Sequence, residues 1–148
     1  MNFSKRSRYG IRALIDLAQN TEYNCVQLNE IADRNGISVK YLEQIFAALR
    51  KAGILRSVKG PQGGYLLAKA PDYLWISEVV LALDGDYCLE KEEARDGNRG
   101  EAEAQVVQSE IIEPINRYID EFLNSLTLKK LVECVEQYKD AANDMYYI

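Results

Sequence analysis

Residues 27–65 decide the fold; they read QLNEIADRNGISVKYLEQIFAALRKAGILRSVKGPQGGY. From Gln27, apolar residues recur at helical spacing until Asn35-Gly36, a pair that tolerates the left-handed conformation in which helices commonly end. Ser38 is then placed to cap a second helix. The apolar stripe of that helix consists of Leu42, Ile45, Phe46 and Leu49. This pattern predicts two short helices joined by a tight turn, a helix-turn-helix.

Two short apolar runs follow, at 54–58 and 65–68, and the segment between them, KGPQGG, is rich in turn residues. The pattern predicts a β-hairpin with a wide loop. After a helix-turn-helix such a hairpin is typical of a wing, in which Lys59 and the bare glycine backbone approach a phosphate or a minor groove. A plain turn is the alternative. A nucleotide-phosphate loop is disfavoured because the glycines lead into a strand at Tyr65 and not into a helix. We therefore expect a mainly α fold with a small β-hairpin, a winged helix-turn-helix.

The side of the second helix opposite its apolar stripe is polar. It centres on Lys40, Gln44, Ala47 and Lys51, with Tyr41 and Glu43 at its margins. Glutamine can bond an adenine edge, lysine can approach guanine or phosphate, and glutamate accepts from a cytosine amino group while being repelled by phosphate. This face can therefore read DNA, although an ordinary solvated surface has the same residue types.

A supporting helix is predicted from Ser4 to Gln19-Asn20, and its first turn is basic. Lys5, Arg6 and Arg8 lie where the helix dipole is already positive, which is unfavourable by about 0.3–1 kcal/mol unless an anion is close. A DNA phosphate would supply that anion, and a solvated basic terminus is the alternative. The residues expected to contact DNA are Lys5, Arg8, Ser38, Lys40, Tyr41, Glu43, Gln44, Lys51, Lys59, Gly60, Gly63 and Gly64.

Several segments of the chain together resemble one protein family. They are SRYG at 7–10, ISVKYLEQ at 37–44, LRKAGIL at 49–55 and GPQGGY at 60–65. This combination resembles the Rrf2 family of bacterial transcription regulators, and the closing DMYYI at 144–148 resembles its CymR-like branch, which has no iron–sulfur cluster. The resemblance implies a DNA-binding homodimer. The branch implies control of sulfur or cysteine metabolism genes and a protein corepressor such as cysteine synthase.

The charge of the chain is divided unequally along its 148 residues. The formal net charge is −5, but residues 1–75 hold 11 Lys and Arg against 6 Asp and Glu, whereas residues 76–148 hold 7 against 17. The basic part contains the predicted DNA reader, and an acidic surface elsewhere discourages unspecific phosphate contacts. No long apolar run, signal segment or prenylation ending is present, so we expect a cytoplasmic protein without a membrane partner.

The chain has three cysteines, Cys25, Cys88 and Cys134. Because their number is odd and they are widely spaced, we expect reduced thiols. Cys25 follows the first helix in a loop and is the candidate redox thiol, with a small buried filler as the alternative. Iron–sulfur members of the resembled family carry three clustered cysteines near position 88. Here only Cys88 is present and the chain has no histidine, so we expect neither a metal nor a cofactor.

A long helical stripe runs from about Glu101 to Leu126 and predicts a dimerisation helix. The residues expected at the interface are Ile111, Ile115, Tyr118, Ile119 and Phe122. Pro114 interrupts the stripe, so the helix either kinks there or begins near Glu113. A last helix and an apolar tail, expected to dock, end the chain. The domains are thus 1–84, a winged helix-turn-helix; 85–100, a charged flexible loop; and 101–148, the dimerisation region.

Three classes of function are compared. Without histidine the chain lacks Ser-His, Cys-His and His-based zinc sites, so we expect no enzyme. A winged helix that binds only protein would show no salt-dependent affinity for DNA. The favoured interpretation is a homodimeric, sequence-specific DNA-binding transcription regulator, a repressor. Thiol sensing through Cys25 and a small ligand held between the two halves of the chain are alternative modes of control.

Overall fold

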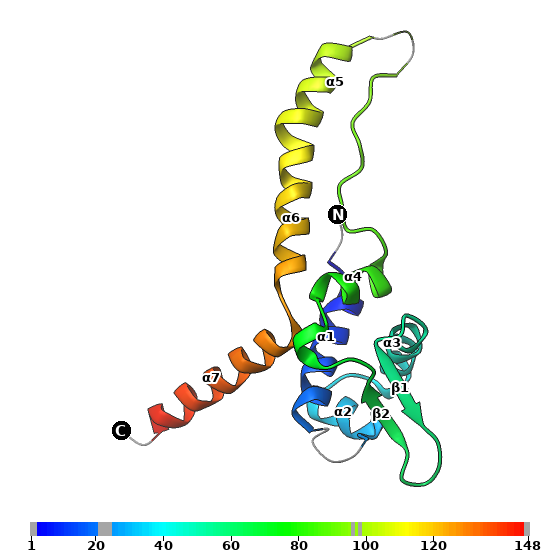
Figure 1. The fold of residues 1–148 in the computed structure, drawn as a ribbon, viewed down its shortest axis with the longest axis vertical. Coiled ribbons are helices and arrows are strands. Elements are labelled where there is room, and N and C mark those ends of the chain that lie inside the picture. Colours follow the sequence, from blue (N-terminus) through cyan, green and yellow to red (C-terminus); the bar gives the residue numbers. More distant parts are fainter. Residues whose placement is uncertain (1–2, 21–24, 96, 98, 147–148) are drawn as a thin grey trace.

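The computed structural model describes the chain except for residues 1–2, 21–24, 96, 98 and 147–148. It is mainly helical with one small antiparallel hairpin, which confirms the expected fold class (Figure 1). A 3₁₀ turn, η1, and a π-helical turn, η2, complete the elements. In order they are α1 Lys5–Asn20, α2 Leu28–Asn35, α3 Val39–Lys51, β1 Leu55–Val58, β2 Gly64–Leu67, η1 Pro71–Tyr73, α4 Ile76–Asp84, α5 Glu101–Val107, η2 Gln108–Ile112, α6 Glu113–Ser125 and α7 Leu128–Tyr146.

The core lies where α1, α2, α3 and α4 meet. All four residues of the predicted stripe on α3 are fully buried, together with Leu14 and Leu17 of α1, Ile31 of α2 and Val79 of α4. Burying a side chain of this kind stabilises the folded state by about 1.5–3 kcal/mol. This core fixes α3 with its opposite face turned outward.

The turn before α3 has the geometry expected from its sequence. Gly36 ends α2 in the left-handed conformation, with φ 63° and ψ 33°, where a side chain would be strained. The Ser38 side chain then accepts a hydrogen bond of 3.1 Å from the backbone N–H of Tyr41, which caps α3. Both local predictions are confirmed.

The hairpin is held by more than its own two strands. Leu55 pairs with Leu67 and Val58 with Gly64, and Val26, just before α2, exchanges two backbone hydrogen bonds with Tyr65. A Cβ atom on Gly64 would collide with the carbonyl oxygen of Val26. The hairpin therefore lies against the segment before α2 because Gly64 allows the two backbones to approach.

Residues 101–125 form one continuous helical run that rises from the body of the molecule (Figure 1). Within it the N–H of Glu113 donates to the carbonyl of Gln108, five residues earlier, which defines the π turn η2. Pro114 follows at once as an early residue of α6. Proline lacks an N–H and crowds the preceding turn, so the wider π turn accommodates it. The helical run is thus continuous through the π turn, and α6 begins within it at Glu113.

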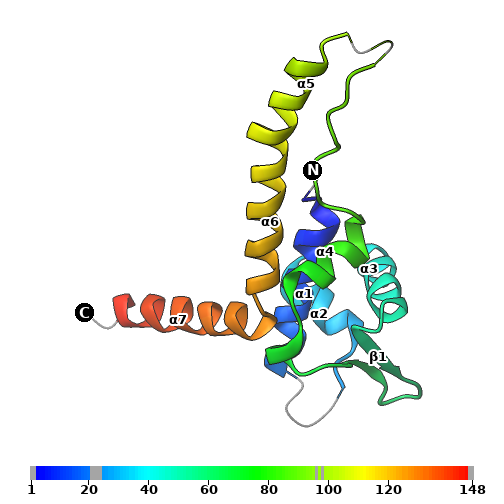
Figure 2. The same cartoon turned by 45° about the horizontal axis from the view of Figure 1, so that its top comes forward.

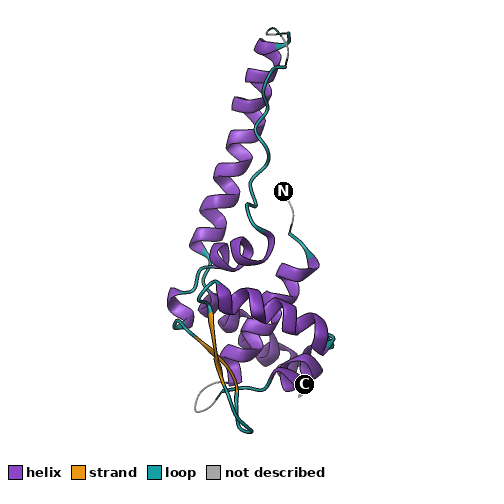
Figure 3. Cartoon of the chain, turned by 90° about the vertical axis from the view of Figure 1, so that its right-hand side faces the viewer, coloured by secondary structure: helices purple, strands orange, loops and turns teal. Residues whose placement is uncertain are grey.

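The described part of segment 85–100 has no helix but lies along the helical run (Figure 3). Tyr87 is buried and its hydroxyl donates to Asp120 at 2.6 Å; burial, and then this hydrogen bond, raise the pKa of Tyr87 to about 12. Asn116 donates to the carbonyl of Leu89 and accepts from its N–H, at 3.1 and 2.7 Å. The first half of this segment is therefore tied to α6 through Tyr87 and Leu89.

The last helix, α7, leaves the body sideways (Figure 2). Its start is anchored by backbone bonds from Ile76 to Leu126 and from Leu128 to Leu74. Met145 is 79% exposed, so this residue of the tail does not dock on its own chain; the end of the tail lies outside the described residues. Cys134 of this helix is exposed. No described helix combines the length and hydropathy needed to cross a bilayer.

Candidate nucleic-acid interface

The outward face of α3 presents the predicted reading residues. Lys40, Glu43, Gln44 and Lys51 are all exposed on one side of this helix. Tyr41 differs because it is half-buried, with its ring edge-to-face against Tyr9 of α1 at 5.9 Å. We therefore name Lys40, Glu43, Gln44 and Lys51 the reading face. It offers two cations, one amide and one carboxylate, the groups needed for base-edge and phosphate contacts.

The wing is joined to α3 by two contacts. The ring of Phe46, fully buried, meets Tyr65 of β2 edge-to-face at 4.9 Å. Arg50 near the end of α3 donates to Ser57 of β1 at 3.2 Å. The reading face and the wing are therefore parts of one rigid unit.

The wing loop exposes Lys59, as predicted, and Gly60 has a φ of 109°, which glycine tolerates. Gly63 has a structural explanation of its own, since a Cβ atom there would collide with the carbonyl of Val58 in the same hairpin. Gly64 also has a structural explanation, since a Cβ atom there would collide with the carbonyl of Val26. Contact of these two glycines with DNA stays a prediction, and their presence is explained without it.

The basic start of α1 has an anion in its own chain. The carboxylate of Asp84, at the end of α4, accepts from the N–H and the hydroxyl of Ser4 and from the hydroxyl of Ser7 at 2.7 Å. It compensates the positive end of the helix, so the basic first turn does not need a phosphate nearby. Lys5 and Arg8 are exposed, and their contact with DNA stays a prediction.

Asp84 gives the fold an acid-sensitive contact. Burial raises its pKa, but the hydrogen bonds from Ser4 and Ser7 outweigh burial and hold the pKa below the ordinary value of 3.8. The ionised Asp84 carboxylate therefore stabilises the fold fully at pH values above its ordinary pKa. This stabilisation is lost as the pH falls through the lowered pKa of the folded state. We expect Asp84→Asn to lower the free energy of unfolding at about pH 6, with a difference from wild type that shrinks towards about pH 3. Urea unfolding across this range measures it; a difference independent of pH would contradict it.

A polar cluster that was not predicted from the sequence holds the turn between α2 and α3. We call it the turn clamp; it is formed by Arg12, Asp16, Arg34 and Asn35. Asp16 of α1 accepts from Nε and Nη2 of Arg34 at 2.9 and 2.7 Å, and from Asn35 at 3.1 Å. Arg12 donates to the carbonyl of Asn35 at 2.6 Å. The hydrogen bond with Asp16 raises the pKa of Arg34. The clamp fixes the turn that precedes the reading helix, and its signal in the sequence is the spacing of Arg12 and Asp16 by one helical turn on α1.

The predicted dimerisation stripe is exposed on α6 and its neighbouring turn. Ile111 is 50%, Tyr118 72% and Phe122 52% exposed, and the rings of Tyr118 and Phe122 stack at 6.5 Å. Ile115 is exposed, whereas Ile119 is half-buried against the core. Such a row of large apolar side chains is unusual on a monomer surface.

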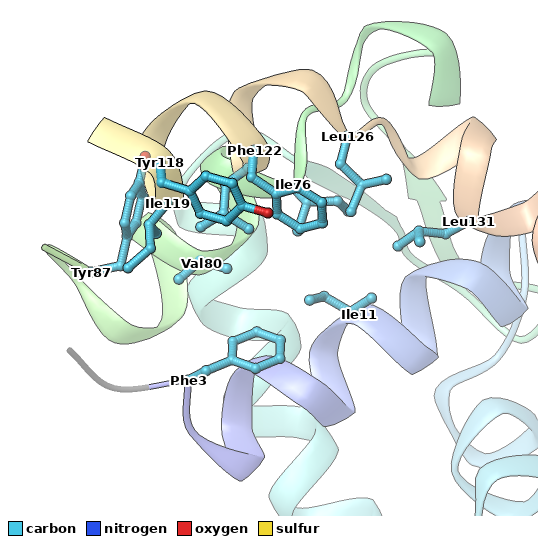
Figure 4. Close-up of a pocket in the computed structure, with 11 residues that line it drawn as sticks. Phe3, Ile11, Ile76, Val80, Tyr87, Tyr118, Ile119, Phe122, Leu126 and Leu131 are labelled. Atoms are coloured by element: carbon cyan, nitrogen blue, oxygen red, sulfur yellow. The ribbon is translucent and has the colours of Figure 1, made fainter. Parts of the chain in front are cut away.

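An apolar pocket of about 380 Å³ continues this stripe into the body between α1, α4, α6 and α7 (Figure 4). Tyr118, Ile119 and Phe122 form one wall of the pocket. Ile11 and Val80 lie across from them, from α1 and α4. The exposed stripe and the pocket together form one apolar surface.

Cys25 is half-buried beside the wing, and its thiol donates to the carbonyl of Gln62 at 3.2 Å. Cys88 is half-buried in segment 85–100, where burial, and then the charge of Asp86, raise the pKa of its thiol. Within the described residues no three His, Cys, Asp or Glu side chains are grouped to hold a metal ion. The residues present do not fit an iron–sulfur cluster.

Comparison with known proteins gives consistent matches. Residues 3–134 match the family Rrf2, described as iron-dependent transcriptional regulators. The regulator IscR of Erwinia tasmaniensis is 36% identical over 132 residues, which is 89% of this chain and 79% of that protein. The structure of CymR, the global cysteine regulator of B. subtilis, matches with a TM-score of 0.73 and 29% identity over 90% of this chain and 97% of that one. An oxidized form of Staphylococcus aureus CymR matches with a TM-score of 0.69 and 30% identity, over 90% and 97%. These proteins are transcriptional regulators, which confirms the expectation of a non-enzymatic chain.

Proposed function

The chain belongs to the Rrf2 family of transcriptional regulators, and from this membership we propose that it is a homodimeric, sequence-specific DNA-binding repressor. The observation that carries the proposal is the exposed reading face, held in one unit with the wing by the Phe46–Tyr65 contact. A reading helix and a wing on one rigid unit can contact a major groove and the adjacent backbone at the same time.

The homodimer is supported by the apolar surface formed by the stripe on α6 and the pocket beside it. A second copy of the chain is the occupant that fits, because an apolar face on both copies can be buried by a two-fold contact. Two-fold symmetry also suits DNA, since half-sites on one side of the duplex recur about every 34 Å. The dimer would then present two reading faces to successive major grooves.

Repression follows if the dimer occupies a promoter and excludes RNA polymerase from it in the bacterial cytoplasm. The likeness to CymR of B. subtilis, a global cysteine regulator, supports genes of sulfur or cysteine metabolism as targets, and a protein corepressor such as cysteine synthase as partner. The proposal takes no iron–sulfur cluster from the similarity to IscR, because the sequence has only Cys88 in segment 85–100 and no histidine.

Selection of bound sequences from random DNA tests the proposal directly. We expect a near-palindrome with two half-sites one helical turn apart, and an affinity that falls steeply with salt. A collection of unrelated sequences would contradict a sequence-specific reader. An affinity that does not depend on salt, or no affinity at all, would favour a protein-binding module.

The reading face and the wing should fail in different ways when mutated. We expect Lys59→Ala to weaken binding to all duplexes and to flatten the salt dependence, because it removes one phosphate contact. Gln44→Ala should instead change which base is preferred, by about 1–3 kcal/mol at one position of each half-site. Glu43→Ala should relax discrimination in the same manner. Gel-shift titrations on the selected operator and on single-base variants measure both effects; equal losses on every duplex from all three variants would refute this division.

A second candidate is control by oxidation of Cys25. Its thiol hydrogen bond to Gln62 lies in the wing, so an added oxygen would disturb the loop that carries Lys59. The structure of Staphylococcus aureus CymR in an oxidized form shows that a related regulator exists in an oxidized state. Peroxide should lower the DNA affinity of the wild type and not that of Cys25→Ser, while Cys134→Ser, which changes an exposed thiol, should respond as the wild type does. Equal responses in all three would reject Cys25 as the switch.

A further inference from the structure

A groove of about 480 Å³ separates α7 from the turn clamp. Its walls carry three cations, Arg12 from α1, Arg34 from α2 and Lys139 from α7, and the carboxylate of Asp16. Two of the three cations belong to the basic part of the chain, residues 1–75, and Lys139 adds a third from the acidic part. The groove therefore has the charge of a site for an anion.

The turn clamp orients the two guanidinium groups but does not occupy all of their N–H donors. Arg12 donates through Nη2 to the carbonyl of Asn35, and Arg34 donates through Nε and Nη2 to Asp16. A guanidinium carries five N–H donors, so each retains donors for another acceptor. Because the clamp holds both side chains, a ligand would not have to order them.

We propose that this groove binds a small organic anion with at least one carboxylate group. Planar guanidinium groups match the two oxygens of a carboxylate, and the Lys139 ammonium adds a further charge from the opposite wall. Ile15 and Val135, which also line the groove, supply apolar contact for a short carbon skeleton. The ligand would bridge α7 to the turn in front of the reading helix.

Because of the position of α7, the proposed anion site lies away from the surface that is expected to meet DNA phosphates. In two views α7 leaves the body on the side away from α3 and the wing (Figures 1 and 2). DNA lying along α3 would thus be on the other side of the helix-turn-helix from Lys139. Binding of the anion does not depend on the proposed function; only the comparison with operator DNA rests on that proposal.

Calorimetric titration of the full-length protein with malonate, without DNA and at constant ionic strength, tests the site. We expect saturable binding with Kd on the order of millimolar, weakened about fivefold by Lys139→Gln. Lys130→Gln is the matched control, because Lys130 stands on the opposite face of α7 by helical periodicity; it should bind as the wild type does. No saturable binding in the wild type, or equal affinity in both variants, would overturn the proposal.

Two further arms identify the ligand class. Sulfate should bind more weakly than malonate, because it has no carbon skeleton for Ile15 and Val135, and equal affinity would overturn the assignment to an organic anion. Operator DNA should bind Lys139→Gln and Lys130→Gln equally when malonate is absent. A selective loss of DNA affinity in Lys139→Gln would identify the groove as a phosphate contact and would also overturn the proposal.

Discussion

Replacing both Tyr118 and Phe122 with aspartate should separate the protein into monomers and lower its affinity for a full operator by about 100-fold or more. The two rings stack on the exposed face of α6, beside the apolar pocket, so the variant would place two like charges from each chain at the proposed two-fold contact. Loss of the partner removes the gain from binding two linked half-sites.

The design separates dissociation from misfolding. Sedimentation should give the monomer mass, while affinity for an isolated half-site should be retained, since the reading face is remote from the substitutions. Glu121→Gln, on the same helix between them and exposed, should remain dimeric. A double variant that stays dimeric and binds the full operator normally would show that the α6 stripe is not the interface.

Replacing Phe46 with alanine should lower the free energy of unfolding by about 3–5 kcal/mol. The side chain is fully buried and contacts both the α3 core and Tyr65 of the wing, so truncation leaves a cavity at their junction. Urea unfolding followed by circular dichroism measures the loss. Tyr73→Ala, which removes a ring that is 72% exposed, is the control and should change stability by no more than about 0.5 kcal/mol. A comparable loss of unfolding free energy in both variants would show that burial of Phe46 between α3 and the wing does not contribute more to stability than an exposed ring does.

Local signals in the sequence predicted the helix-turn-helix well. The cap at Ser38, the left-handed Gly36 and the buried stripe of α3 depend on neighbours within a few residues, and all are present. The exposure of the reading face followed from the same periodicity. Tyr41 was harder to place because its half-burial depends on Tyr9, on another helix.

Contacts between distant segments were not predictable from local patterns. Asp84 meets the start of α1 across 77 to 80 residues, so the basic first turn was assigned to phosphate. The turn clamp joins α1 to α2 in the same way. Gly64 was interpreted as open backbone for DNA, whereas its neighbour in space is Val26. A single sequence specifies these partners only once the helices have been packed.

The π turn before Pro114 has a consequence for the rotational phase of the upper helix. In a regular α-helix, Gln108 and Asn116 would be offset by ~80° around the axis after about two turns. The wider π turn reduces this angular offset, so both side chains reach the same extended segment. Gln108 accepts a hydrogen bond from the N–H of Glu92 at 2.7 Å, and Asn116 accepts one from the N–H of Leu89. Removing one residue there would rewind the run as a plain α-helix and rotate α5 around its axis, leaving α3 and the wing unchanged.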